Sequence, residues 1–394
     1  MTPPLHGLRI VELGTMIAVP AATQLLASYG AQVIKVEDTG IGDPLRFYGS
    51  QRNGMSGWFA NVNSGKRSIA IELKVEAGKA LLWQLLASAD VLIEGFRPGV
   101  MEKLGFGYQA VNTRLPNLIY CSSSGFGDSG PYAQEGAYDP LIQALTGWAG
   151  AQLMDQVPTL IRGMVADKVG AWNNAQSIMA AIIRRERTGE SSHIVNSMLD
   201  GNLAFNWPDL MMHCTLQDHE GVDHRPNLLQ TYRLYNARDG FVSLAVGTDK
   251  QWQAMCETLE KPDMASDPRF VSGAQRAINI VDWYNTMDAM VATLDVEEVV
   301  AKLKAADVPV APVYLPDEVA ADPQVQAAGL VQTSQHPQLG AYQHTRSRSA
   351  VMGSDIELQP APSQGEHSLM LLEELGYSAE SIEGLIAEGA VQAS

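Results

Sequence analysis

The sequence predicts an α/β protein with a large domain built on a parallel sheet and a second, smaller domain. Two observations lead to this fold class. Runs of alternating, β-branched residues are followed by runs with helical spacing and then by further strand-like runs, so that strand–helix–strand units repeat. A polar, loop-like stretch over residues 215–230 then separates these units from a second region of strands and helices.

The first unit lies within residues 8–37. Residues 8–13 (LRIVEL) are apolar at alternate positions and predict a strand. Residues 19–30 have helical spacing and finish on a glycine that can end a helix, and residues 31–37 predict a second strand. Two strands joined in this way form a βαβ unit, which implies a parallel sheet.

The same pattern continues along the first half of the chain. It predicts strands over 67–73, 90–96 and 115–127 and a helix over 75–89. From Lys168 onward, apolar side chains such as Val169, Trp172 and Met179 keep a helical period, which predicts a helix that stops near the RTGE sequence at 187–190.

The second half of the chain predicts the smaller domain and a return to the larger one. Residues 193–214 are typical of a strand that runs into a helix. A strand-plus-helix region then opens at 239–248, with amphipathic helices at 252–270 and 281–306. An extended segment at 308–314 and a helical tail at 365–389 complete the chain's predicted elements. We expect the tail to pack back onto the first domain. The predicted division is therefore a large domain from 1–224, a small α+β domain from 225–310, and a segment 311–394 that completes the large domain.

Charge and composition exclude several classes of protein. The formal net charge of −17 argues against nucleic-acid binding, in which contacts to phosphates dominate. Positions 1–110 contain ten Lys and Arg residues and nine Asp and Glu residues, so this segment carries a charge of +1 and the remainder −18. An anionic ligand would therefore bind in the first segment, unless the uneven charge is only scattered over solvated surface.

The sequence also predicts a cytoplasmic protein. No apolar run approaches the ~20 residues of a membrane span, and residues 1–13 lack the pattern of a signal peptide. Cys121, Cys214 and Cys256 lack metal-site spacing and cannot all pair, which fits a reducing compartment.

The usual cofactor and hydrolase motifs are missing from the sequence. No G-x-G-x-x-G follows the first strand, so dinucleotide binding is not expected. The eight histidines form no H-x-x-x-H or H-E-x-x-H pattern, and no G-x-S-x-G is present, so neither a metal site nor a serine hydrolase is expected.

Asp167 lies where an apolar stretch becomes a helix and is surrounded by small residues. One interpretation is a helix N-cap, which would stabilise the protein by ~1 kcal/mol. The other is a carboxylate nucleophile with room for a substrate. The two are compatible, because one oxygen can cap the helix while the other faces a cleft.

Other candidate residues surround the predicted strand ends. Tyr138 and Asp139 precede a proline that suits the first turn of a helix, and the Gly/Ser loop over 122–133 can present N–H groups to an oxyanion or serve only as a turn. Five cations, each of which can instead be a solvated surface charge, are placed to hold phosphates: Lys66, Arg67, Lys74, Arg97 and Lys103.

Several segments in the right order resemble the family III CoA-transferases, a family that also includes α-methylacyl-CoA racemase. The resemblance runs over nearly the whole chain and is carried by GLRIVELGTMIAVPAATQLLASYGAQVIKVE, NSGKRSIAIELK, ADVLIEGFRPGVMEKLGFG, SGFGDSGPYAQEGAYDPLIQALTG, ADKVGAWNNAQSIMAAIIRRERTGE, SDPRF and GEHSLMLLEELGYS. It implies a Rossmann-like large domain built from both ends of the chain, a small domain between them, and an interlocked homodimer.

The resemblance also implies how CoA binds, as a substrate and without any tightly bound cofactor. The phosphates would lie near Arg97, Lys103 and Lys74, and the thioester end near residues 136–139. The full set of residues expected to contact CoA is Ala18, Glu72, Leu73, Lys74, Gly95, Phe96, Arg97, Lys103, Ala137, Tyr138 and Asp139.

In the transferases that the chain resembles, the catalytic residue is an aspartate at the position of Asp167. The implied reaction moves CoA from an acyl-CoA to a free carboxylic acid through an aspartyl anhydride and an aspartyl–CoA thioester. Asp167 is expected to be ionised at pH 7, because an unperturbed Asp titrates near ~3.9. Backbone N–H groups near 137–139 would stabilise the oxyanions.

Two alternatives remain open at this stage. The racemases carry a Gly-His-Asp sequence where this chain has Ala137, Tyr138 and Asp139, and the missing histidine weakens that assignment. A non-catalytic CoA-binding homologue is the other alternative. The formyl-CoA transferases carry Gln and Arg at the positions of Ile17 and Asp38, and their glycine-rich loop is missing from 225–240, so oxalate is not predicted as the acceptor.

Overall fold

The computed structural model describes residues 1–154, 157–217, 220–222, 232–354 and 356–393. The chain divides into two compact units, a larger one of Met1–Gln217 with Gly329–Ser394 and a smaller one of Asp218–Ala328. No helix in the described part of the chain is both long enough and apolar enough to cross a membrane.

The larger unit is built on a seven-stranded sheet with the order β10-β7-β6-β1-β2-β5-β16. Every neighbouring pair is parallel except β16 with β5. This confirms the predicted α/β fold with a parallel sheet, and the six parallel strands follow the 3-2-1-4-5-6 order of doubly wound sheets. The strands are β1 (Arg9–Leu13), β2 (Gln32–Glu37), β5 (Lys66–Ile71), β6 (Val91–Glu94), β7 (Ile119–Ser124), β10 (His193–Ser197) and β16 (Val391–Gln392).

Helices cover both faces of this sheet because its strands are apolar on both sides. Ile10 and Val33 pack with α1 (Ala18–Ala27) and α8 (Val165–Thr188) on one face. Val11 and Ile34 pack on the other face with α3 (Glu76–Ala87), α4 (Val100–Leu104), α5 (Tyr108–Arg114), α16 (Ser368–Glu374) and α17 (Ala379–Ala387).

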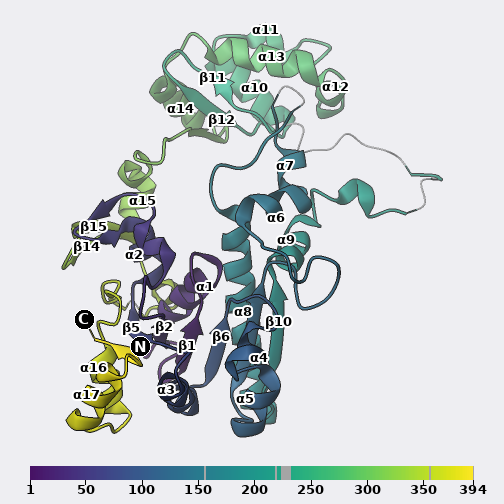
Figure 1. Ribbon diagram of the computed structural model, residues 1–394. Helices are drawn as coiled ribbons and strands as arrows, with labels where there is room; N and C mark the ends of the chain where they lie inside the picture. The colour runs from purple at the N-terminus through teal and green to yellow at the C-terminus, as the bar shows by residue number, and fades with distance from the viewer. Residues whose placement is uncertain (155–156, 218–219, 223–231, 355, 394) are drawn as a thin grey trace. The chain divides into compact units, whose positions relative to one another are not determined.

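The C-terminal tail returns to the larger unit, as predicted. Leu371, Leu372, Ile382 and Val391 belong to the same core cluster as strands β1, β2 and β5. Figure 1 shows these last elements beside the β5 edge of the sheet. The single predicted helix over 365–389 is two helices, because Gly376 lies between them with a φ of 88°.

The remaining elements of the larger unit lie in its connections. Its helices are α2 (Gly57–Asn63), α6 (Asp139–Leu145), α7 (Trp148–Ala151) and α9 (Met198–Asn206), with 3-10 turns η1 (Pro44–Phe47), η2 (Met212–Cys214) and η5 (Arg348–Met352). Its short strand pairs are β3 (Gln51–Arg52) with β4 (Met55–Ser56), β8 (Leu153–Met154) with β9 (Val157–Pro158), and β14 (Val331–His336) with β15 (Gly340–Thr345).

The smaller unit packs helices against a three-stranded antiparallel sheet of β11 (Tyr235–Asn236), β12 (Phe241–Leu244) and β13 (Val310–Pro312). Trp252, Met255 and Trp283 lie in its core. Each of the two long helices predicted here is interrupted in the structure. The helices are α10 (Asp249–Thr258), α11 (Pro262–Ala265), α12 (Gly273–Ile278), α13 (Ile280–Val291), α14 (Val296–Ala305) and α15 (Pro323–Ala327), with the 3-10 turn η4 (Val319–Ala321).

The limits of the smaller unit differ from the predicted domain of 225–310. The structural unit extends to Ala328, and β13 pairs with β12 across residue 310, so the chain stays with this sheet beyond that point. The predicted boundary between 224 and 225 and most of the loop-like stretch 215–230 lie outside the described residues.

Buried charges connect strands β1, β2 and β5 of the larger unit. Glu12 on β1 accepts hydrogen bonds of 2.8 Å from the ammonium groups of Lys35 on β2 and Lys66 on β5, and all three side chains are fully buried. Lys35 also pairs with Asp43 at 2.9 Å. Asp43 in turn accepts the N–H of Met16, whose φ is 64°, so this network fixes the turn between β1 and α1.

Candidate active site

A cavity of about 490 Å³ opens at the carboxyl edge of the sheet in the larger unit. It lies where β1 and β6 are neighbours, the point at which the strand order reverses and at which doubly wound sheets bind ligands. Its walls are residues 15–19 after β1, 95–98 after β6, 123–126 at the end of β7, Ala133, residues 135–140, Met164, Asp167 and Met198.

The structure brings most of the residues singled out in the sequence to this cavity. The ones that line it are Ala18, Gly95, Phe96, Arg97, Ala137, Tyr138, Asp139 and Asp167. The ones outside its lining are Glu72, Leu73, Lys74 and Lys103. Lys74 and Lys103 are exposed, while Glu72 and Leu73 are half-buried beside the end of β5.

Asp167 lies in the first turn of α8, which begins three residues before the predicted start at Lys168. Its side chain caps no helix, so the N-cap interpretation is wrong: the N-cap residue is Met164, and it contributes no side-chain hydrogen bond. Among the described residues the Asp167 carboxyl has no hydrogen-bonding or ion-pair partner. It is a half-buried carboxyl group that faces the cavity and is not used by the fold.

Burial and a neighbouring carboxylate raise the pKa of Asp167. Loss of water around the carboxyl group is the larger cause and the negative charge of Asp139 the second, and together they raise the pKa to about 7. The raised pKa contradicts the expectation that Asp167 ionises like an unperturbed aspartate, so the protonated form is also populated at pH 7.

Asp139 holds the N-terminus of α8 in place from α6. Its Oδ2 accepts the N–H groups of Ala166 and Asp167 at 2.7 and 3.1 Å, and its Oδ1 accepts Nε2 of Gln143 at 2.6 Å. The side chain is 7% exposed. Asp139 thus supplies the cap that α8 lacks locally, and its charge lies next to Asp167 as a consequence.

Two residues that the sequence reasoning missed complete this arrangement. Gln143, 2% exposed, accepts the N–H of Ile161 at 2.9 Å and so ties the segment before α8 to α6. Asn202 donates to the carbonyl of Ala166 at 3.0 Å and accepts Nε1 of Trp148. Only Gln143 left a signal in the sequence, its spacing of four residues from Asp139 on a helix, at which Gln and Asp side chains meet.

Arg97 is the one cationic side chain among the described residues that line the cavity. It has no hydrogen bond or ion pair to any described residue. A Cβ atom at Gly136 would lie 2.9 Å from Nη2 of Arg97, so the glycine leaves room for the guanidinium. Arg97 is therefore free to bind an anion at the cavity.

Two of the other candidate cations are already paired in the fold, and the assignment of the fully buried Lys66 as a phosphate ligand is wrong. Lys66 is buried and bonded to Glu12, Asn63 and the carbonyl of Pro20. Burial and the neighbouring Lys35 ammonium lower the pKa of Lys66 to about 8, although Glu12 opposes the change. Arg67 pairs with Glu374 at 2.6 Å.

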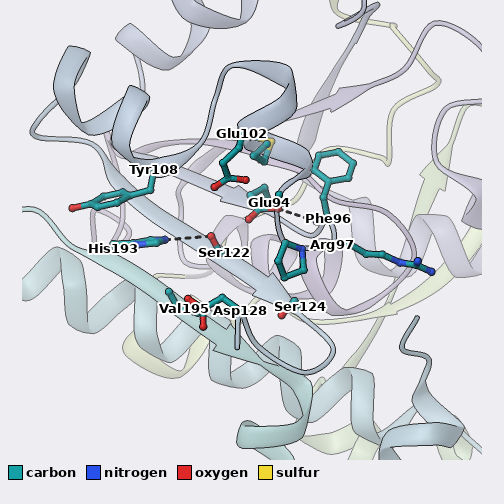
Figure 2. A pocket seen from close by; sticks show the side chains of 13 residues that line it. Glu94, Phe96, Arg97, Glu102, Tyr108, Ser122, Ser124, Asp128, His193 and Val195 are labelled. Carbon is teal, nitrogen blue, oxygen red and sulfur yellow. Dashed lines mark hydrogen bonds between the residues drawn. The ribbon is translucent and has the colours of Figure 1, made fainter. Parts of the chain in front are cut away.

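A second cavity of about 100 Å³ shares Phe96, Arg97, Pro98 and Ser124 with the larger one. Figure 2 shows Glu94 from β6 and His193 from β10 on either side of Ser122. The contact between Ser122 Oγ and His193 Nε2 measures 3.4 Å, and Glu94 accepts the N–H of Phe96 at 2.9 Å. Burial raises the pKa of Glu94 to about 7, and its hydrogen bond shapes the loop that carries Arg97.

Comparison with known proteins identifies relatives over most of the chain. A family model described as CoA-transferase family III matches residues 5–368. An acetyl-CoA:oxalate CoA-transferase of Acetobacter aceti is 36% identical over 340 residues, which cover 83% of this chain and 85% of that protein. A succinate–glutarate CoA-transferase of Agrobacterium fabrum (strain C58 / ATCC 33970) is 33% identical over 390 residues, covering 95% of this chain and 96% of that one.

A solved structure supports the same relationship. A CAIB/BAIF family protein from Brucella suis superposes with a TM-score of 0.84 and 30% sequence identity, over 95% of this chain and 100% of that one.

Proposed function

The chain belongs to CoA-transferase family III, and from this premise we propose that it moves CoA from an acyl-CoA to a free carboxylic acid, with Asp167 as the nucleophile. The observation that carries the proposal is the Asp167 carboxyl group. It faces a cavity at the ligand-binding edge of the sheet, has no partner among the described residues, and is oriented by a helix that Asp139 caps.

The reaction proceeds by exchanges at two carbonyl groups. The ionised Asp167 attacks the thioester carbonyl, the C–S bond breaks, and CoA leaves as the thiolate while a mixed anhydride forms between the acyl group and Asp167. The thiolate then attacks the Asp167 carbonyl of the anhydride, which gives an aspartyl–CoA thioester and releases the first acid as a carboxylate. A second carboxylate repeats the two steps in reverse and restores Asp167. Each step is easier than a direct exchange between the two acids.

Backbone N–H groups are available to stabilise the oxyanions of these steps. Those of Ala137, Tyr138 and Asp139 have no hydrogen-bond acceptor among the described residues, and all three residues line the cavity. Donors that are fixed before the reaction stabilise developing negative charge at no cost of reorganisation. This supports the placement of the thioester carbonyl beside residues 137–139.

CoA itself extends from this cavity. In the proposal, Arg97 binds a phosphate, Ala18, Gly95 and Phe96 contact the pantetheine arm, and the exposed Lys74 and Lys103 meet the distal phosphates together with Glu72 and Leu73. The unpaired state of Arg97 and its place on the cavity wall support this placement. In this proposal CoA is a substrate of the reaction and not a tightly bound cofactor.

The active form is a homodimer with interlocked subunits in this proposal. Helices α6, α8 and α9 are packed neighbours and leave large apolar side chains exposed to solvent, a surface that single-chain proteins rarely present. These side chains are Leu141, Leu145, Trp172, Ile183 and Phe205, and the exposed Trp207 directly follows α9. Sedimentation at micromolar concentration is expected to give twice the mass of the chain, and a monomer would contradict the assignment.

The experiment that tests the proposed reaction traps the intermediate. The protein is mixed briefly with a panel of acyl-CoAs, quenched with hydroxylamine or borohydride, and analysed by intact mass and peptide mapping. Wild type is expected to gain a hydroxamate or an alcohol at Asp167, and Asp167→Ala is expected to gain neither. Asp317→Ala, at an exposed aspartate of the smaller unit, is the matched control and should label like wild type. Labelling of Asp167→Ala would show that Asp167 is not the nucleophile.

The racemase alternative makes a different prediction for the same protein. It requires α-deuterium to enter an acyl-CoA in D₂O without any acid acceptor. No histidine is found among the described residues that line the cavity, and Tyr138 is 69% exposed, so nothing in the site favours that reaction.

A further inference from the structure

Much of the cavity wall is apolar. One hydrophobic cluster brings Met198, Ala18, Phe126 and Ala137 to this wall, and another brings Ile17, Met16 and Met164. Met164, the N-cap residue of α8, belongs to one cluster and Ala166, in the first turn of that helix, to the other, and both closely precede Asp167 in sequence. Whatever is joined to Asp167 in the reaction therefore emerges among hydrocarbon side chains.

The packing on α8 places Met198 close to Asp167. Gly170 follows Asp167 by three residues and so lies on the same side of the helix. A Cβ atom at Gly170 would be 3.3 Å from Cγ of Met198 and 4.0 Å from Cβ of Ala18. The glycine thus lets these two side chains approach the helix directly beside the reacting carboxyl group.

The charged residues that line the cavity lead to the same conclusion. Its charged lining among the described residues is Arg97, Glu135, Asp139 and Asp167. Asp139 is already bonded through both oxygens, and the proposed function assigns Arg97 to CoA. A second carboxylate on the acyl group would find no cation left on this lining, which also carries the carboxylates of Glu135 and Asp139. Unpaired charge in such surroundings is strongly disfavoured.

We propose that this site accepts acyl groups with uncharged aliphatic chains, so that its acids are monocarboxylic and not dicarboxylic. The inference rests on the proposed function, because it takes Asp167 as the point of attachment. It separates this chain from the relatives whose names specify oxalate, or succinate and glutarate, as substrates. Ile17, Phe126 and Met198 are the residues that determine the specificity.

The test compares butyryl-CoA with succinyl-CoA, whose acyl groups have the same number of carbons and differ in the terminal carboxylate. The first readout is exchange of labelled butyrate into butyryl-CoA and of labelled succinate into succinyl-CoA, which needs no second acid. Each buried methylene favours binding about fourfold, and burial of an unpaired carboxylate opposes it. The expected kcat/KM for butyryl exchange is at least about 30-fold above that for succinyl exchange.

The second readout is binding of butyryl-CoA, succinyl-CoA and free CoA to Asp167→Asn, measured by calorimetry. Binding is measured without any acid acceptor, so it reports the pocket even if the covalent mechanism is wrong. The expected order is butyryl-CoA tightest, at least about tenfold above free CoA, with succinyl-CoA no tighter than free CoA.

Phe126→Ala is expected to remove most of the difference between butyryl-CoA and free CoA, while Phe241→Ala, at an exposed phenylalanine of β12 in the smaller unit, leaves it unchanged. Ile17→Ala repeats the same binding comparison at a residue of the other hydrophobic cluster. Succinyl-CoA binding or exchanging as well as butyryl-CoA would overturn the inference. A binding preference for butyryl-CoA without any exchange would uphold it and reject the transfer reaction.

Discussion

Replacing Asp167 with Asn is expected to stabilise the protein in alkaline solution. The folded state raises the pKa of this carboxyl group from 3.8 to about 7, so ionisation is harder in the folded protein than in the unfolded chain. Stability from such a group is fully present below its unfolded pKa and is lost as the pH rises through the folded pKa. Asn has nearly the same shape and never ionises, so Asp167→Asn should not lose that stability.

The magnitude follows from the difference between the two pKa values. About three pKa units correspond to about 4 kcal/mol at 1.36 kcal/mol per unit. The free energy of unfolding of Asp167→Asn should therefore exceed that of wild type by up to about 4 kcal/mol at pH 8.5, and by little at pH 4. For a unit of this size the difference amounts to about 8 °C in the melting temperature.

The assay is thermal unfolding of both proteins, followed by fluorescence at half-unit steps from pH 4 to pH 8.5. Asp317→Asn, at an exposed carboxylate of the smaller unit, is the control and should show no such pH-dependent gain. Equal melting temperatures for Asp167→Asn and wild type at pH 8.5 would refute the environment described for the carboxyl group. A lower melting temperature for the variant would mean that the charged carboxylate has a stabilising partner.

Three further results are expected. The rate of CoA transfer should rise with pH around a midpoint near 7, and Asp139→Asn should move this midpoint to lower pH by removing a negative charge beside Asp167; a midpoint unchanged in the pH–rate profile would contradict the coupling. Arg97→Gln should raise the KM for acyl-CoA about tenfold with kcat within about twofold, and steady-state kinetics showing a fall in kcat alone would argue against phosphate binding. Glu12→Gln should lower the free energy of unfolding, measured with denaturant, by about 3–5 kcal/mol, because its two buried lysine partners lose their carboxylate. A decrease of less than about 1 kcal/mol would mean that the lysines find other partners.

The order of strands and helices could be predicted from the sequence because it depends on local patterns. Alternating β-branched residues and helical spacing persist over each element whatever lies elsewhere in the chain. The interruptions were not visible in this way. The predicted single tail helix, for example, breaks at Gly376, whose left-handed backbone a pattern of apolar residues does not reveal.

The site was only partly predictable because its interactions join distant residues. Asp167 was identified, but its cap was misassigned, since the group that caps α8 is Asp139, 27 or 28 residues away from its partners. The sequence does not reveal that Lys66 is paired, because its partner Glu12 is 54 residues earlier in the chain. Residues known only through a family resemblance, such as Lys74, remain predictions about a bound ligand.

The antiparallel strand β16 has a consequence for the synthesis of the protein. Ile71 at the end of β5 pairs with Val391, so the edge of the sheet stays open while about 320 further residues leave the ribosome. An unpaired strand edge invites contact with other nascent chains. During that interval the smaller unit, which uses only Asp218–Ala328, has already emerged in full. Chaperone binding to this edge during that interval should therefore raise the yield of correctly completed sheets.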